Sequence, residues 1–438
     1  MAILINKVLE AVLEKSVCLH TIGCRLNFSE TATIAQKFQD RGYSIVEFGN
    51  KADVTVLNTC TVTDGADSTC RNLIRRSHRS SPEGKIVVVG CYAQMEPDSI
   101  ADMKGVDLVL GTNEKQNIFK YLDEEHDNKV QVELTNEFWG AATTKADSHT
   151  RAFLKIQDGC NYICSFCIIP KARGRSRAIS ISEAVIQAKK LIENGFKEIV
   201  LTGVNIGEYE KSTGVPFYKL VDKILELDGL KRLRLSSVEP NTFSENLLSV
   251  LKSSDKVMNH FHIPMQSGDD EILSRMRRRY TVAEYIKVID RIKNLFPDAG
   301  IGADIILGHP GESKKHFENT FNLLRDLPIT HFHPFPFSKR KGTMSASMED
   351  QVHSATKKDR VKQIIDLGNI KLESFSKQLV GKTNFVLFEK KSSDGLYEGY
   401  STNFARVFVN SERNLSNMIL PVSISDYQNN RLIGKILN

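Results

Sequence analysis

Strand and helix patterns alternate six times between residues 151 and 337, and this alternation constrains the fold more than any other feature of the chain. Each predicted strand is a short apolar run, and a segment with helical periodicity follows it. The predicted strands are AFLKIQ, EIVLTG, RLRLSSV, FHIPMQS, GIGADIIL and THFHPFPF. Repeated βα units build a parallel sheet that curves toward a barrel. Six of them therefore predict a partial (β/α)6 barrel, two units short of a closed one.

A smaller α/β domain is predicted ahead of the barrel. The runs VCLHTIG, DVTVLNT and KIVVVG have the pattern of strands, and helical segments lie between them. Asn27 with Glu30 three residues later is typical of a helix start, and Gly42 of a helix end. This alternation predicts a parallel sheet with helices.

The last part of the chain is different. A long helix is predicted near residues 357–379, and short strands separated by Gly, Asn and Asp follow it. Such strands predict a small β-barrel or sandwich. The expected organisation is an N-terminal extension over residues 1–15, an α/β domain over 16–128, a linker over 129–148, the partial barrel over 149–376 and the β-rich tail over 377–438.

Composition argues against a membrane protein. No apolar run reaches the roughly 18 residues that a membrane-spanning helix needs. The opening MAILINKVLEAVLEK is amphipathic, but it contains Glu10 and Glu14 and lacks a cleavage site, so we interpret it as a short helix rather than a targeting segment. We therefore expect a cytoplasmic protein with no membrane partner. The net charge of +6 is too small to establish a polyanionic partner by itself.

Three of the eight cysteines are packed into one loop after the first barrel strand. Cys160, Cys164 and Cys167 have the spacing C-x3-C-x2-C, and no fourth Cys or His follows within the loop. Cysteines of a cytosolic protein rarely form disulfides, so metal binding or catalysis is expected. Structural zinc usually has four protein ligands, whereas three thiolates leave one iron of an iron-sulfur cluster open. The spacing therefore favours an open cluster over a zinc knuckle or three core cysteines.

A second set of candidate cluster ligands lies in the first predicted domain. Cys24, Cys60 and Cys91 each follow the carboxyl end of a different predicted strand, and such ends converge at one edge of a parallel sheet. Three converging thiols again make a site with one open iron. Cys18 lies within a strand and Cys70 within a helix, which suits small buried side chains.

The segment QDGCNYICSFCIIPKARGRSR resembles the radical S-adenosylmethionine superfamily. With TIGCRLNFSET, VLNTCTVTDGAD and VVVGCYAQ, it resembles the methylthiotransferase family within it, from about residue 16 to the end. The resemblance implies two 4Fe-4S clusters, S-adenosylmethionine as cofactor, and an antiparallel RNA-binding β-barrel called TRAM as the tail. Cys160, Cys164 and Cys167 would hold the radical cluster, and Cys24, Cys60 and Cys91 a cluster with a sulfur-donor role.

Other strand ends resemble the cofactor-binding segments of the superfamily. The side chains or backbone expected at S-adenosylmethionine are Thr202, Gly203, Asn205, Ser237, Glu239, Gln266 and Ser267. Two features depart from the family pattern. Residues 1–15 form an extension, and His309 in GHPGE stands where the family commonly has Phe. A ring at position 309 would either alter the cofactor pocket or face a strand carbonyl.

Within the family, GCRLNFSET, TCTVTD and IPKARGRSR look most like the branch that acts on tRNA threonylcarbamoyladenosine. The resemblance implies conversion of this nucleoside, beside the anticodon, to its 2-methylthio form. It also implies a tRNA anticodon arm, an electron donor such as flavodoxin or ferredoxin, and a sulfur source as partners. The same chemistry on isopentenyladenosine or on an aspartate of a ribosomal protein is the alternative, and a metal-stabilised RNA-binding protein is the non-enzymatic one.

A basic strip follows the cysteine loop. Lys171, Arg173, Arg175 and Arg177 alternate, so in an extended segment they would share one side. Such a face suits an RNA backbone, although a solvated loop explains it equally well. RNLIRRSHR, RMRRRY and SKRKG extend the basic track. Six tail aromatics are candidates for base stacking or for the core: Phe385, Phe388, Tyr397, Tyr400, Phe404 and Phe408.

Overall fold

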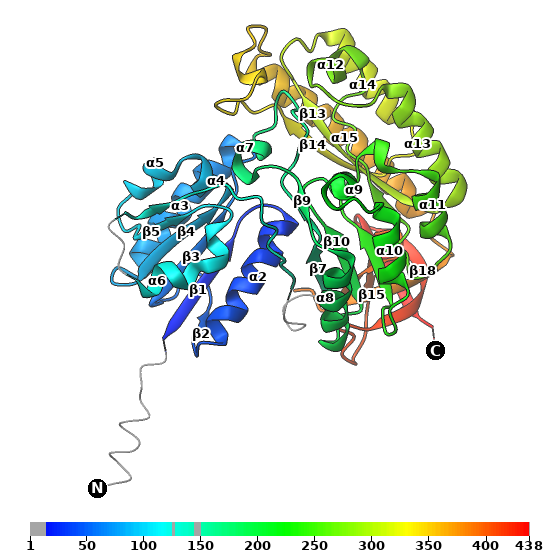
Figure 1. Cartoon of the computed structure of the whole chain (residues 1–438). Helices are drawn as coiled ribbons and strands as arrows, with labels where there is room; N and C mark the ends of the chain where they lie inside the picture. Colours follow the sequence, from blue (N-terminus) through cyan, green and yellow to red (C-terminus); the bar gives the residue numbers. More distant parts are fainter. Residues whose placement is uncertain (1–14, 125–127, 144–149, 438) are drawn as a thin grey trace. The chain divides into compact units, whose positions relative to one another are not determined.

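The computed structural model describes residues 15–124, 128–143 and 150–437 (Figure 1). The chain forms two compact units, one made of residues 1–144 and 168–175, the other of residues 145–167 and 176–438. Within the described ranges, no helix has the length and hydrophobicity needed to span a bilayer. Of the predicted N-terminal extension, only Lys15 belongs to these ranges.

The first unit contains a parallel sheet of six strands in the order β2-β1-β3-β4-β5-β6. In chain order they are β1 (Ser16–Thr21), β2 (Ser44–Val46), β3 (Val54–Thr59), β4 (Lys85–Gly90), β5 (Leu108–Leu110) and β6 (Val130–Gln131). The helical elements are α2 (Arg25–Gln39), α3 (Asp64–Ser80), α4 (Cys91–Met95), α5 (Pro97–Ala101), η1 (Glu114–Asn117), α6 (Ile118–Asp123) and α7 (Ile169–Arg173). The predicted parallel α/β domain is confirmed.

Both faces of this sheet are covered, which explains its nearly continuous apolar strands. On one face, Ile34 and Phe38 of α2 and Phe119 of α6 join the core of strand residues. On the other, Cys70 and Ile74 of α3 join helices α4 and α5. Cys70 is fully buried and Cys18 nearly so, which confirms that these two thiols are core side chains.

Two features of this unit differ from expectation. Strand β6 lies inside the predicted linker 129–148, because its backbone pairs with β5 and extends the sheet. Helix α7 also belongs to this unit although it follows the cysteine loop. The Thr112 hydroxyl donates a hydrogen bond to the Ala172 carbonyl over 2.9 Å and so holds α7 in place. Neither pairing leaves a local pattern in the sequence.

The second unit contains the partial barrel. Its strands are β7 (Arg151–Lys155), β10 (Glu198–Thr202), β11 (Arg232–Leu235), β12 (His260–His262), β13 (Gly300–Leu307) and β14 (His331–Pro336). They form two parallel sheets of three strands, β11-β10-β7 and β12-β13-β14. Parallel bridges from Leu233 to Val257 and from Ser237 to His262 link the two sheets. All six predicted strands are present, and the open (β/α)6 arrangement is confirmed.

Helices flank the barrel strands (Figure 1). They are α8 (Ile181–Glu193), α9 (Tyr209–Thr213), α10 (Phe217–Leu225), α11 (Glu245–Lys252), α12 (Asp270–Arg275), α13 (Val282–Leu295) and α14 (Lys314–Asp326). Several begin at the side chains that the sequence pattern favours. Ser180 caps α8, and Thr281 with Glu284 forms a capping box at α13. Two short strands, β8 (Gln157–Asp158) and β9 (Arg177–Ala178), pair antiparallel around the cysteine loop.

The long helix α15 (Ser354–Lys377) leads to a closed five-stranded barrel. Its strands are β15 (Thr383–Lys391), β16 (Tyr397–Ser401), β17 (Arg406–Val409), β18 (Ile419–Gln428) and β19 (Arg431–Ile436). The predicted barrel is confirmed, with one correction. It is not wholly antiparallel, because β17 and β19 pair in parallel and close it. Short strands that follow one another in the sequence are expected to pair as antiparallel hairpins, so the parallel pairing of β17 with β19 was not predicted.

The tail packs against the amino ends of the barrel strands. The Arg232 guanidinium donates hydrogen bonds to the carbonyls of Phe385 and Tyr400, over 2.7 and 3.0 Å. The Phe404 ring stacks on His260, with centroids 4.5 Å apart, and on Tyr400 at 4.6 Å. This leaves the carboxyl ends, where barrel enzymes place their chemistry, away from the tail.

The six candidate aromatics of the tail divide into three groups. Phe388, Tyr397 and Phe408 are buried in the small barrel. Tyr400 and Phe404 are used against the large barrel. Phe385, with 57% of its side chain exposed, is the member of the set that remains available for stacking on a base.

Candidate functional site

The cysteine loop of the second unit leaves strand β8 at the carboxyl end of the barrel. Cys160, Cys164 and Cys167 are all partly exposed. The loop turns at Gly159, whose φ of +68° suits glycine. Burial is the main cause that raises the pKa of the Cys160 thiol to about 12, so a metal has to displace a tightly held proton there.

A buried ion pair supports Cys164. Arg278 donates a hydrogen bond to the Cys164 Sγ over 3.2 Å and also pairs with Glu239. Burial raises the pKa of the Cys164 thiol, and the neighbouring Arg278 charge opposes that shift. Arg278 therefore favours the thiolate form that binds iron. Arg278 belongs to RMRRRY, which was predicted to extend a basic RNA track, and its burial and pairing correct that interpretation.

His309 is part of a chain of hydrogen bonds that supports the cysteine loop at Ser165. Its Nε2 lies 2.8 Å from the Ser345 hydroxyl, and its Nδ1 lies 3.0 Å from the Pro310 carbonyl. Ser345 in turn donates to the Ser165 hydroxyl, which donates to the Arg275 carbonyl. Burial lowers the pKa of His309 to about 4, so the ring is neutral near pH 7. The ring therefore does not carry charge into the pocket, and the carbonyl that it faces, that of Pro310, lies beyond the end of strand β13 rather than in a strand.

Strand ends near the loop present buried oxygen atoms that lack partners. Among the described residues, no hydrogen-bond partner is found for Asn205 Oδ1, Glu208 Oε1, Ser236 Oγ or Gln266 Oε1. A buried polar atom without a partner is costly, so such a group indicates a place for a polar ligand or water. These atoms come from the ends of β10, β11 and β12 or the segments after them, and Asn205 and Glu208 contact the cysteine loop at Cys160 and Asn161. The barrel end thus fits S-adenosylmethionine.

The predicted cofactor residues divide into two classes. Asn205 lies at the site, with its amide nitrogen 3.8 Å from Cys160 Sγ, and Gln266 adopts the unusual φ of +61° there. Ser237 and Glu239 are partly exposed at the same strand end. By contrast, the Thr202 hydroxyl donates to the carbonyl of Val200 in its own strand, and the Ser267 hydroxyl faces helix α14. A direct side-chain role for these two is not supported.

Gln157 was missed by the sequence analysis. Its Oε1 accepts from the Asn205 backbone over 2.8 Å, and its amide donates to the Gly159 carbonyl over 2.7 Å. A Cβ at Gly203 would lie 2.8 Å from the same Oε1, so glycine is required for this approach. Gln157 therefore ties the start of the cysteine loop to the end of β10. The residues around Gln157 in the sequence contain no pattern that predicts this role.

The first unit brings Cys24, Cys60 and Cys91 to one edge of its sheet. Cys24 follows the end of β1 after two residues, and Cys60 and Cys91 come directly after β3 and β4. These three strands are neighbours in the sheet. Cys24 is exposed, while Cys60 and Cys91 are buried. A Cβ on Gly23, whose φ is +115°, would lie 3.1 Å from Cys60 Sγ. The predicted convergence at neighbouring strand ends is observed.

Electrostatics also link these three thiols. Burial raises the pKa of Cys60 to about 12, and the nearby Cys91 and Cys24 thiols raise it further. Burial raises the pKa of Cys91 too, whereas Arg173 and Lys115 lower it. Within the described ranges, no three His, Cys, Asp or Glu side chains are close enough to hold a single metal ion. In an iron-sulfur cluster each thiolate binds a different iron, so its three thiolates lie farther apart than the ligands of a single ion, and thiolates are the ligands that such clusters use.

The basic strip does not have the predicted shape. It is not an extended segment, because Lys171 and Arg173 lie on helix α7 and Arg177 lies on β9. Arg173 is buried with Glu30, and Arg177 is buried with Asp158. Burial and ion pairing keep these two from an RNA backbone, so that part of the prediction is wrong. Lys171 and Arg175 are exposed.

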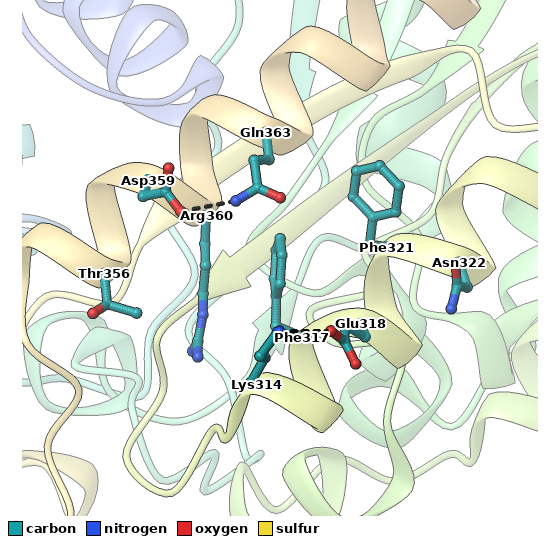
Figure 2. Close-up of a pocket in the computed structure, with 9 residues that line it drawn as sticks. All are labelled: Lys314, Phe317, Glu318, Phe321, Asn322, Thr356, Asp359, Arg360 and Gln363. Atoms are coloured by element: carbon teal, nitrogen blue, oxygen red, sulfur yellow. Dashed lines mark hydrogen bonds and ion pairs between the residues drawn. The ribbon is translucent and has the colours of Figure 1, made fainter.

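One pocket of the second unit lies on the outside of the barrel, between α14 and α15 (Figure 2). Phe317 and Phe321 line it, and Gln363 donates to Asp359 at its edge. Arg360 also lines the pocket, with its guanidinium over the Phe317 ring, and it pairs with the buried Glu312. It contains neither a cysteine nor any predicted cofactor residue, so we assign it no catalytic role.

Comparison with known proteins gives consistent results. Residues 154–324 match the radical SAM superfamily, and residues 16–111 match the uncharacterized protein family UPF0004. The chain is 37% identical to the threonylcarbamoyladenosine tRNA methylthiotransferase MtaB of Bacillus subtilis, over 93% of each chain. The MtaB of Aquifex aeolicus is also 37% identical, over 84% of this chain and 91% of the relative.

A second branch is also similar. The tRNA-2-methylthio-N(6)-dimethylallyladenosine synthase of Fusobacterium nucleatum is 32% identical, over 97% of this chain and the whole of the relative. Among solved structures, the radical S-adenosylmethionine methyltransferase TsrM of Kitasatospora setae has a TM-score of 0.56 at 14% identity. It covers 76% of this chain and 77% of its own, and it shows the likeness of fold. The chain belongs to the methylthiotransferase family of radical S-adenosylmethionine enzymes.

Proposed function

We propose that this enzyme converts N6-threonylcarbamoyladenosine of tRNA, beside the anticodon, to its 2-methylthio derivative. The observation that carries the proposal is the presence of two three-cysteine sets at the carboxyl ends of parallel strands, in a chain similar to enzymes that bear this name. Inserting sulfur into an unactivated C–H bond is beyond ordinary acid-base groups, so the reaction requires a radical cofactor.

The second unit would bind the radical cofactor. Cys160, Cys164 and Cys167 supply three thiolates, and a cluster bound by them supplies the electron that activates S-adenosylmethionine. Asn205, Ser236 and Gln266 direct unpartnered oxygen atoms to the same end of the barrel, where they accept hydrogen bonds from the cofactor. Glu239 is held by Arg278, so its role is to position the loop as well as to face the pocket.

The first unit would bind the sulfur-donating cluster at Cys24, Cys60 and Cys91. Alanine at any of these positions should lower the iron content of the purified protein and abolish product formation. Cys18→Ala is the matched control, because Cys18 is a buried core thiol of the same unit. A cysteine variant that keeps both full iron content and activity would remove that residue from the ligand set.

tRNA is the proposed substrate, and the tail barrel is proposed to hold its anticodon arm. Exposed Lys171 and Arg175 and the exposed ring of Phe385 suit phosphate and base contacts. A low-potential reductant such as flavodoxin or ferredoxin would supply electrons, and a sulfur source would replenish the donated atom. The proposal places the reaction in the cytoplasm.

Isopentenyladenosine in tRNA is the second candidate substrate, because the Fusobacterium nucleatum relative named for it is also similar over its whole length. A ribosomal-protein aspartate is a third candidate. A metal-stabilised RNA-binding protein without enzymatic activity is the remaining alternative. Visible absorption by the purified protein distinguishes iron-sulfur clusters from zinc, which has no visible transition.

Mass spectrometry of tRNA nucleosides, with and without this gene, tests the proposal directly. Loss of 2-methylthio-threonylcarbamoyladenosine alone is the expected result. Loss of the isopentenyl product instead would redirect the enzyme to the second substrate. No change in tRNA, with a change in a ribosomal protein, would contradict the tRNA assignment.

A further inference from the structure

Three charged side chains are buried together in the first unit. Glu30 of α2, Lys115 of η1 and Arg173 of α7 are each at most 1% exposed. The Glu30 carboxylate accepts from Lys115 Nζ at 2.5 Å and from Arg173 at 3.1 and 3.2 Å. We call these three side chains the charged triad.

The charged triad carries two cations and one carboxylate. An arginine stays protonated in proteins, whereas burial lowers the pKa of Lys115 and the Glu30 charge opposes that shift. Burying charge is expensive unless an opposite charge compensates it. Two cations around one carboxylate favour an anion close to Lys115 and Arg173.

The place for such an anion is indicated by the hydrogen bonds of Lys115 and Arg173. Lys115 Nζ lies 3.5 Å from Asn58 Oδ1, in the strand that ends directly before Cys60. Arg173 also donates to Asn27 Oδ1 over 2.7 Å. The Asn27 amide donates to the carbonyls of Ile22 and Thr59, just before Cys24 and Cys60. Arg173 thus contacts the side chain that joins two cysteine-bearing connections.

We propose that Arg173 and Lys115 are positioning residues that compensate the negative charge of the cluster held by Cys24, Cys60 and Cys91, and that they set its reduction potential. This inference rests on the proposed function of the first unit. It assigns Arg173 to the sulfur-donor site instead of to RNA binding.

The charges of the triad predict the direction in which each substitution shifts the reduction potential of the cluster. Reduction adds a negative charge to the cluster, so nearby positive charge stabilises the reduced form and raises the potential. Arg173→Gln removes a cation and should make the potential more negative. Glu30→Gln removes an anion and should make it less negative. Opposite shifts from two neighbouring substitutions are not expected from a purely structural defect.

The test uses the full-length chain with Cys160, Cys164 and Cys167 changed to alanine, so that only the first-unit cluster remains. After anaerobic reconstitution, a redox titration followed by electron paramagnetic resonance gives the midpoint potential. Lys171→Gln is the matched control, because Lys171 is an exposed cation on the same helix. Arg173→Lys, which keeps the charge, should restore most of the potential lost in Arg173→Gln.

The expected result is a lower potential in Arg173→Gln, a higher one in Glu30→Gln, and no change in Lys171→Gln. Arg173→Gln in the otherwise unchanged enzyme should also keep its tRNA affinity. Unchanged potentials with weakened tRNA binding would overturn the inference and leave the cluster assignment intact. Absence of iron from the three-alanine parent would overturn the cluster assignment itself. If Arg173→Gln does not fold, Lys115→Gln carries the same expected shift.

Discussion

Arg278 contacts Cys164 directly: its guanidinium donates to the Sγ atom over 3.2 Å and is held there by Glu239. Arg278→Gln should slow reductive cleavage of S-adenosylmethionine by about 10- to 100-fold, which is typical for the loss of a residue that orients a metal ligand. Production of 5′-deoxyadenosine measures this directly. Arg277→Gln is the control, because Arg277 is exposed. Equal rates in the two variants would show that the contact is dispensable.

Gly23→Ala should disrupt the first-unit cysteine site. The new Cβ would lie 2.7 Å from the Cys60 Cβ, and the φ of +115° disfavours a side chain. Gly42→Ala has a similar positive φ but meets no atom within 4 Å, so it should cost only on the order of 1 kcal/mol of backbone strain. Thermal unfolding and iron content compare the two. Similar iron content in both variants would contradict the requirement for glycine at position 23.

Phe385→Ala and Phe404→Ala should have different effects. Removing exposed Phe385 should weaken tRNA binding by about 1–3 kcal/mol if it stacks on a base, without loss of stability. Phe404 has a φ of +69° and stacks on His260, so its loss should instead loosen the tail. Fluorescence binding and hydrogen exchange of the tail measure the two effects. Unchanged tRNA affinity in Phe385→Ala would remove this ring from the RNA surface.

Acid should destabilise the barrel through His331. Burial, followed by the neighbouring His333, His262 and Arg234 charges, lowers the pKa of His331 to about 4. The unfolded chain therefore binds more protons between about pH 6.5 and pH 4, and stability falls as pH falls through that window. His331→Gln should lower by about one the number of protons that the chain takes up when it unfolds in this pH range. Thermal midpoints across this range give the slope, and an unchanged slope would contradict the assignment.

Periodic features of the fold were predictable from the sequence. The run GIGADIIL is the whole of strand β13, since an apolar stretch bounded by Gly and turn residues has a clear local pattern. The same holds for Cys24, Cys60 and Cys91, because each is next to a strand end. Local order along the chain was enough in these cases.

Long-range pairing was not predictable. Arg173 alternates with other cations in the sequence, but its carboxylate partner Glu30 is 143 residues earlier. Arg278 is one of three consecutive arginines, and the thiol that it contacts is 114 residues earlier. Charge in a local window suggests solvent or RNA, and only the fold shows which cation is buried. The short strand β6 and the parallel β17–β19 pair were missed for the same reason.

The first unit is discontinuous in the chain, because helix α7 completes it from beyond the cysteine loop. Domains usually fold in the order in which the ribosome makes them. Here the ribosome has synthesised β7, β8 and all three loop cysteines before Arg173 is available to Glu30 and Lys115. The first unit therefore begins synthesis first and is completed only after the second has begun, so a nascent chain that stalls within the cysteine loop leaves both units unfinished.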